Sequence, residues 1–168
     1  MCSILGIFDI KDDPKPLRQL ALKLSKRQRH RGPDWSGVFS SDQVILAHER
    51  LAIVDVEHGA QPLFSLDRSL VLAVNGEIYN HRPLEQGLDR PYDFQTKSDC
   101  EVILALYDQK RNRYFIARDP IGVMPLYTGY DEHGHFYVAS EMKALIDTCR
   151  TIREFPPGHF LDSETGKV

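Results

Sequence analysis

A cysteine at position 2 is the residue of this chain best suited to covalent chemistry. If the initiator methionine is removed, Cys2 carries its thiol and a free α-amine on the same carbon atom. An α-amine has a pKa of about 7.7–8.0, so near neutral pH it can accept a proton from its own side chain. The resulting thiolate would attack an amide and leave a thioester for water to hydrolyse. Taken alone, Cys2 is more simply explained as a small residue that opens a strand.

A second pattern, Asn75-Gly76, follows the apolar run of residues 70–74. A side-chain amide next to a glycine N–H offers two donors for a tetrahedral oxyanion. The same dipeptide is also the commonest hairpin turn. The local sequence therefore leaves an oxyanion hole and a turn as alternatives.

Two charged residues fit the two ends of an amino-acid substrate. Arg50 precedes the apolar run 51–54, and a guanidinium held at the edge of a core suits bidentate binding of a carboxylate. Asp99 begins a predicted helix and can pair with an ammonium group. Taken singly, Arg50 is more simply explained as a surface charge, and Asp99 as an acid placed to favour the helix dipole.

The chain that positions these residues has 168 residues, which fits one domain over 1–168. Its 21 Lys and Arg and 24 Asp and Glu give a net charge of −3, which argues against a nucleic-acid partner. No apolar run reaches the roughly 18–20 residues that cross a bilayer, and no signal-peptide pattern opens the chain. We therefore expect no membrane partner and a cytoplasmic location. The three cysteines, Cys2, Cys100 and Cys149, lack paired spacing, so we expect free thiols and no metal site.

Apolar periodicity and turn residues predict an α+β fold with several short antiparallel strands. The predicted strands cover residues 3–10, 43–47, 51–56, 69–74, 114–117, 125–130, 136–139 and 158–161. The predicted helices cover residues 16–29, 98–107 and 140–146. No pattern predicts an oligomeric state.

Longer motifs recur in order along the chain. They are Cys-Ser-Ile-Leu-Gly at 2–6, His-Arg-Gly-Pro-Asp at 30–34, His-Glu-Arg-Leu at 48–51, Val-Asn-Gly-Glu-Ile-Tyr-Asn at 74–80, Ser-Asp-Cys-Glu at 98–101, Arg-Asp-Pro-Ile-Gly-Val-Met-Pro-Leu-Tyr at 118–127, Ser-Glu-Met-Lys-Ala-Leu at 140–145 and Pro-Pro-Gly at 156–158. This set resembles the glutaminase domain of glutamine-hydrolysing asparagine synthetase, a class II amidotransferase with an N-terminal nucleophile. The motifs at 74–80 and 140–145 favour this branch over the glucosamine-phosphate and phosphoribosyl branches.

The resemblance implies a four-layer αββα sandwich with two antiparallel sheets, and hydrolysis of L-glutamine to glutamate and ammonia. It implies that Cys2 is the nucleophile and its amine the base, and that Asn75 and the Gly76 N–H form the oxyanion hole. Arg50 would bind the α-carboxylate of glutamine and Asp99 its α-amine. The remaining pocket residues implied are Leu51, Ala52, Ile53, Val54 and Glu77, and the loop at 30–34 would be a lid. We expect no metal or cofactor in this chain, because ATP and magnesium belong to the family's synthetase domain.

The sequence departs from the family at two places. The Ser-Gly-Gly-x-Asp-Ser loop of the synthetase domain is absent, so we expect this chain to contain the glutaminase domain only. The family also has a loop and a buried strand, broadly Gly-Met-Phe-Ala-Phe-Ala-Leu-Tyr-Asp, before the strand at 114–118. Here Ala-Leu-Tyr-Asp at 105–108 runs directly into Gln-Lys-Arg-Asn. We therefore expect one strand and one loop to be missing near residues 107–112.

Two arrangements of this junction are open. If residues 98–107 stay helical, four residues span at most about 14 Å, less than the roughly 17–20 Å of a strand crossing. Alternatively, residues 102–108 pair with 113–119 as a hairpin and displace Asp99. The missing strand also keeps open a non-catalytic glutamine-binding or regulatory protein. An amidotransferase that supplies ammonia to another acceptor is a third possibility.

Overall fold

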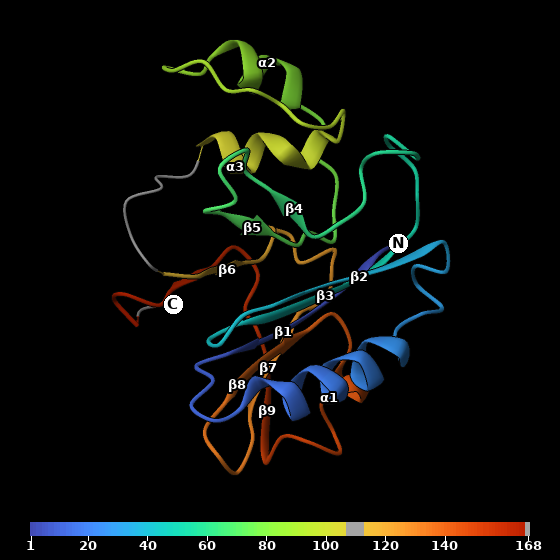
Figure 1. The fold of residues 1–168 in the computed structure, drawn as a ribbon, viewed down its shortest axis with the longest axis vertical. Coiled ribbons are helices and arrows are strands. Elements are labelled where there is room, and N and C mark those ends of the chain that lie inside the picture. The colour runs from blue at the N-terminus through green and yellow to red at the C-terminus, as the bar shows by residue number, and fades with distance from the viewer. Residues whose placement is uncertain (107–112, 167–168) are drawn as a thin grey trace.

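The computed structural model of the protein describes residues 1–106 and 113–166 and has four layers (Figure 1). The strands are β1 (Ser3–Phe8), β2 (Trp35–Ser40), β3 (Ile45–Arg50), β4 (Leu63–Phe64), β5 (Val71–Leu72), β6 (Phe115–Ala117), β7 (Tyr127–Tyr130), β8 (Phe136–Ala139), β9 (Thr151–Glu154) and β10 (Phe160–Asp162). The helices are α1 (Pro14–Lys26), α2 (His81–Gln86) and α3 (Val102–Leu106), with 3-10 turns at Asp99–Glu101 and Met142–Ala144.

The largest layer is a six-stranded antiparallel sheet in the order β2-β3-β1-β8-β7-β9. The central strand, β1, pairs with β3 on one side and with β8 on the other. Because side chains alternate along a strand, Leu5 and Ile7 point to one face of the sheet while Ile4 and Phe8 point to the other. Both faces of β1 are therefore covered, and the strand that follows Cys2 is fixed in the core.

Helix α1 covers one face of this sheet (Figure 1). Its first turn is capped by Asp13, whose carboxylate accepts the N–H of Lys15. The buried residues Ala21 and Leu24 of the helix pack against Leu5 and the other residues on that face. Helical spacing predicts this amphipathic helix, and the structure confirms it.

The opposite face of the sheet carries two small antiparallel sheets, β4-β5 and β6-β10. One apolar cluster joins Phe8 and Val138 of the large sheet to Ile116 of β6. A further cluster, around Leu63 and Leu104, joins β4 to α3. Helices α2 and α3 form the outer layer on this side (Figure 1). These layers confirm the predicted αββα arrangement.

Several local predictions need correction. Residues 51–56 form no strand, because the carbonyl groups of this loop are bound by the side chain of Arg50. The alternative prediction that 102–108 pairs with 113–119 as a hairpin is wrong for the described residues, because Val102–Leu106 is helical. The predicted helix at 140–146 is only a short 3-10 turn. The elements β2, β4, β9 and α2 were not predicted. The proposed junction at 107–112 lies outside the described residues.

Within residues 1–106 and 113–166, no helix is long and apolar enough to cross a membrane. The same residues contain no group of three or more His, Cys, Asp or Glu side chains arranged to hold a metal ion.

Candidate active site

Nine of the ten residues predicted from the sequence line one cavity of about 280 Å³. They come from the start of β1, the loop after β3, the segment after β5 and the turn before α3. The exception is Ala52, whose backbone N–H instead donates to Asp34 at 2.8 Å. This bond ties the predicted lid loop to the wall of the cavity. The cavity is slightly smaller than the roughly 300–1,000 Å³ of drug-sized ligand sites, which suits a substrate the size of an amino acid.

Cys2 immediately precedes β1, and the residue is half-buried in the cavity wall. The backbone N–H of Leu51 donates to the sulfur at 3.3 Å. Met1 is largely exposed and lines the same cavity. While Met1 is attached, the nitrogen of Cys2 is an amide that cannot act as a base, so the proposed chemistry depends on its removal.

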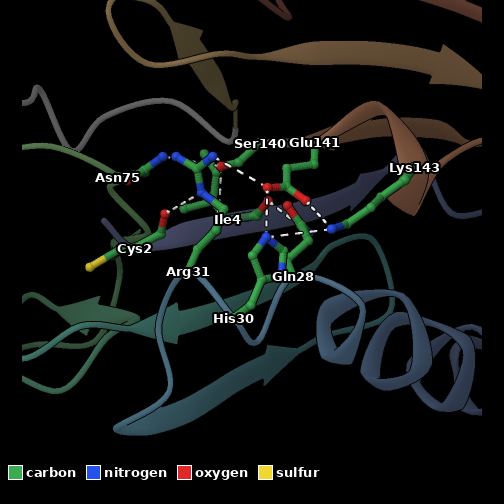
Figure 2. A network of polar contacts seen from close by, with 9 residues as sticks. All are labelled: Cys2, Ile4, Gln28, His30, Arg31, Asn75, Ser140, Glu141 and Lys143. Atoms are coloured by element: carbon green, nitrogen blue, oxygen red, sulfur yellow. Dashed lines mark hydrogen bonds and ion pairs between the residues drawn. The ribbon is translucent and has the colours of Figure 1, made fainter.

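A network of polar side chains contacts the backbone carbonyl of Cys2 (Figure 2). Arg31 donates from Nε to the Cys2 carbonyl at 3.0 Å and from Nη1 to Glu141 at 3.3 Å. His30 and Lys143 contact the same carboxylate at 3.1 and 2.8 Å. Burial acts to raise the pKa of Glu141, but hydrogen bonds from Lys143 and Arg31 outweigh it and keep the pKa below its usual value. Figure 2 shows the sulfur pointing away from this network.

Asn75 and Gly76 do not form a hairpin turn. Neither residue has the positive φ that a type I′ turn requires, and the segment leads to α2 instead of a paired strand. The side-chain amide of Asn75 donates to Ser140 Oγ at 3.3 Å (Figure 2). Ser140 is fully buried, and its Oγ also accepts the N–H of Ile4 at 3.0 Å. Thus one hydroxyl links Asn75 to the strand that follows Cys2.

His48 holds the residue before Asn75. Its Nε2 lies 3.0 Å from the carbonyl oxygen of Val74, and the residue is fully buried. Burial lowers the pKa of His48 to about 4, so the ring is neutral at physiological pH and donates from Nε2 to the carbonyl. His48 enters the sequence analysis only as part of the motif at 48–51. Its position two residues before Arg50 in β3 puts it on the same face of the strand, which was the available signal.

Arg50 is buried at the end of β3 and organises the loop that follows it. Its guanidinium donates to the carbonyl groups of Val54, Asp55 and Val56 at 2.9, 2.7 and 3.0 Å. These bonds occupy three of the five N–H groups of the guanidinium. The rest stay available to a carboxylate in the cavity that Arg50 lines.

Asp99 lies in the turn before α3, where it is buried and lines the cavity. One carboxylate oxygen accepts the N–H of Ile78 at 2.5 Å, so Asp99 is tied to the segment that contains Asn75. Nearby, the backbone N–H of Lys97 donates to Asp55 at 2.8 Å and lowers the pKa of that carboxyl group. The two charged anchors are therefore joined through the loop at 54–56.

A second thiol in this cavity was not anticipated. Cys100 lines it, and its sulfur lies 3.6 Å from the carbonyl oxygen of Gly76. Burial and the charge of Asp99 raise the pKa of Cys100 to about 12, so this thiol stays protonated near neutral pH. Cys149 is also a free thiol, and burial raises its pKa to about 12.

Residues 1–110 and 103–160 both match the sequence profile of the family described as "Glutamine amidotransferase domain". The chain belongs to this family. The amidotransferase domain is 55% identical over 188 aligned positions to asparagine synthetase B (glutamine-hydrolyzing) of Escherichia coli K12, with 100% of this chain and 34% of that protein covered. It is 50% identical to a probable asparagine synthetase (glutamine-hydrolyzing) of Schizosaccharomyces pombe, with 98% and 34% covered. The chain thus spans about a third of the length of these curated relatives.

Two solved structures share the fold of the amidotransferase domain. One is described as the allosteric regulatory enzyme of purine biosynthesis, with a TM-score of 0.77 and 23% identity over 96% of this chain and 46% of that one. The other is glutamine phosphoribosylpyrophosphate amidotransferase from B. subtilis, with a TM-score of 0.75, 24% identity, and 96% and 47% covered. These likenesses confirm the predicted N-terminal-nucleophile fold.

The comparisons also bear on the predicted junction. The two profile matches overlap at residues 103–110, as expected for a chain joined across two similar stretches. The alignment with the E. coli relative has 188 positions, so at least 20 of them hold no residue of this 168-residue chain.

Proposed function

We propose that this domain hydrolyses glutamine to glutamate and ammonia through a thioester on Cys2, after removal of Met1. The observation that carries the proposal is the convergence of a thiol, a side-chain amide, a guanidinium and a buried carboxylate on one small cavity. These groups match the reacting amide and the two charged ends of a single amino acid. The names of the asparagine synthetase relatives support glutamine as the substrate.

In the proposed mechanism, the α-amine of Cys2 takes the thiol proton and the sulfur attacks the side-chain amide carbon of glutamine. The carbonyl electron pair moves onto oxygen, where Asn75 Nδ2 and the Gly76 N–H donate to it. As the carbonyl re-forms, the C–N bond breaks, and the leaving nitrogen takes the proton from the α-ammonium and departs as ammonia. Water then attacks the thioester, which releases glutamate and restores the thiol.

Binding is proposed to use opposite charges at the two ends of the substrate. The unoccupied N–H groups of Arg50 bind the α-carboxylate, and Asp99 binds the α-ammonium. The residues Leu51, Ile53, Val54 and Glu77 shape the wall between them, and the loop at 30–34 limits access. No metal or cofactor takes part in these steps. The ammonia is proposed to serve asparagine synthesis by a synthetase domain, as the names of the relatives suggest.

The test is release of ammonia and glutamate by protein whose intact mass shows loss of Met1. Cys2→Ala should abolish release, whereas the matched control Cys149→Ala should keep it. Equal activity of the Cys2→Ala and unmodified proteins would refute the proposed nucleophile. Saturable glutamine binding without a thioester adduct by mass spectrometry would instead support the non-catalytic alternative. That alternative is favoured by the 20 or more aligned positions that this chain lacks.

A further inference from the structure

Gln61 lines the same cavity as Asn75 and Gly76, and no step of the proposed mechanism uses it. The residue is buried and lies two positions before β4. Its side-chain oxygen Oε1 accepts the backbone N–H of Val74 at 2.6 Å. Because Val74 directly precedes Asn75, this contact acts on the segment that carries the proposed oxyanion donors.

The side-chain oxygen of Gln61 takes the place of that residue's own backbone carbonyl. The N–H of Ser65 donates to the carbonyl oxygen of Leu70 at 3.2 Å, and bonded pairs recur at every second position of an antiparallel ladder. The register of β4 with β5, continued by four residues, makes Gln61 and Val74 such a pair. The carbonyl of Gln61 instead lies against Gly37 of β2, where an added Cβ atom would overlap it.

His48 holds the other polar group of Val74. Its Nε2 donates to the Val74 carbonyl oxygen at 3.0 Å from a buried position in β3. Gln61 and His48 thus bind the N–H and the C=O of one residue, and we call these two contacts the Val74 clamp. Peptide groups are planar, so once the clamp fixes those on either side of Val74, the torsion angles of Asn75 decide where the Gly76 N–H points.

Side chains also hold the segment beyond Asn75. The thiol of Cys100 lies 3.6 Å from the carbonyl oxygen of Gly76, and Asp99 accepts the N–H of Ile78 at 2.5 Å. In the described part of the chain, no strand pairs with residues 74–78. Because side chains replace a ladder here, the loss of one of them can turn a peptide group without unfolding a strand.

We propose that Gln61 is a positioning residue for glutamine hydrolysis, which through the Val74 clamp fixes the directions of the Asn75 side chain and the Gly76 N–H. The inference rests on the proposed function, in which these two donors stabilise the oxyanion. Donors that are oriented in advance need no reorganisation during the reaction, and their effect depends on this. Loss of the clamp should therefore lower kcat and leave substrate binding by the two charged anchors intact.

The test measures ammonia release by the full chain after loss of Met1. Gln61→Met has a similar length but lacks the acceptor, so kcat should fall about tenfold, with KM for glutamine nearly unchanged. Gln61→Glu keeps an oxygen acceptor for the Val74 N–H and should restore most of kcat. The matched control Gln19→Met changes an exposed residue of α1 that does not line the cavity, so it should be as active as the unmodified chain.

Hydrogen exchange followed by NMR tests the Val74 clamp without reference to activity. In the unmodified chain, the amide of Val74 should exchange at least about tenfold more slowly than in an unstructured peptide. Gln61→Met should accelerate this exchange about fivefold more than that of Ile7 in β1, as expected for the loss of one hydrogen bond. The measurement on the unmodified chain keeps the test decisive if Gln61→Met does not fold.

Three results would overturn the positioning role of Gln61. They are an unchanged kcat in Gln61→Met, an equal fall of kcat in Gln61→Glu, and unprotected exchange of the Val74 amide in the unmodified chain. If the unmodified chain releases no ammonia although this amide is protected, the proposed function fails and the positioning role fails with it. An unchanged kcat of Gln61→Met in an active chain overturns the positioning role alone.

Discussion

Replacing Ser140 by alanine tests whether the hydroxyl that joins β1 to Asn75 orients the oxyanion donor. The change leaves the buried N–H of Ile4 without its acceptor at 3.0 Å, which costs about 1–3 kcal/mol. For a chain of this size we expect Tm to fall by about 3–10 °C. It also releases the amide of Asn75, held at 3.3 Å. Loss of an oxyanion donor costs about 10²–10³ in kcat, so loosening one should lower kcat about tenfold and leave KM for glutamine nearly unchanged.

The assay is ammonia release with thermal melting, in two backgrounds. In the Asn75→Ala background, Ser140→Ala should still lower Tm but should no longer change kcat, because the amide that Ser140 orients is gone. Ser3→Ala is a matched control, since Ser3 is a buried serine of β1 whose hydroxyl has no hydrogen-bond partner in the described residues. An unchanged kcat in Ser140→Ala, or the same fall in both backgrounds, would refute the reasoning.

Three further predictions concern His48, Arg50 and a pair of glycines. Burial lowers the pKa of His48 to about 4, so as pH falls below about 6.5 the unfolded state takes up a proton on this residue before the folded state does. The free energy of unfolding therefore decreases between about pH 6.5 and pH 4 and is unaffected by this group above about pH 6.5. The decrease amounts to about 3 kcal/mol. In His48→Gln, the free energy of unfolding measured with urea from pH 4 to 8 should therefore depend less steeply on pH. Arg50→Lys should raise KM for glutamine about tenfold or more, because an ammonium cannot hold the loop carbonyls and a carboxylate together; limited proteolysis of the loop at 54–56 should accelerate, and an unchanged KM would contradict the assigned role. Gly32→Ala puts a methyl group against the backbone of Glu49 and should cost about 1–3 kcal/mol. Gly76→Ala meets nothing closer than 3.9 Å and should leave Tm unchanged, so an equal loss in both variants would contradict this.

The elements with strong periodicity were predictable, and those whose stability depends on distant partners were not. Alternating or helical apolar patterns identified β1, α1, β7 and β8. Strand β2 lacks such a pattern, because it contains Gly37 and two serines and forms by pairing along its length with β3. The run at 51–56 has a strand-like composition, but the guanidinium of Arg50 binds its carbonyl groups. The periodicity of apolar residues gives no sign that a side chain hydrogen-bonds to carbonyl groups four to six residues later.

For the candidate site, the sequence identified reactive residue types but not the groups that orient them. The chemistry of a thiol, an amide, a guanidinium and a carboxylate is local, and the resemblance to a family supplied their assembly. The supporting contacts of Ser140 and His48 were missed, because each joins residues that are 136, 65 or 26 positions apart. The contacts of Ser140 require β1 to lie beside β8, and the contact of His48 requires the segment after β5 to pack against β3.

Because β1 lies inside the large sheet, the part of the candidate site that contains Cys2 should be more resistant to local unfolding than the part that contains Asn75 and Asp99. Amides of this strand are protected on both sides by neighbouring strands, so they should exchange with solvent only when the whole domain unfolds. The segment with Asn75 and Asp99 belongs to the smaller layers, which can open as a separate cooperative unit. Such a partial opening would leave Cys2 in place on an ordered strand while taking away the groups that face it. Native-state hydrogen exchange would then detect inactive molecules that are still mostly folded.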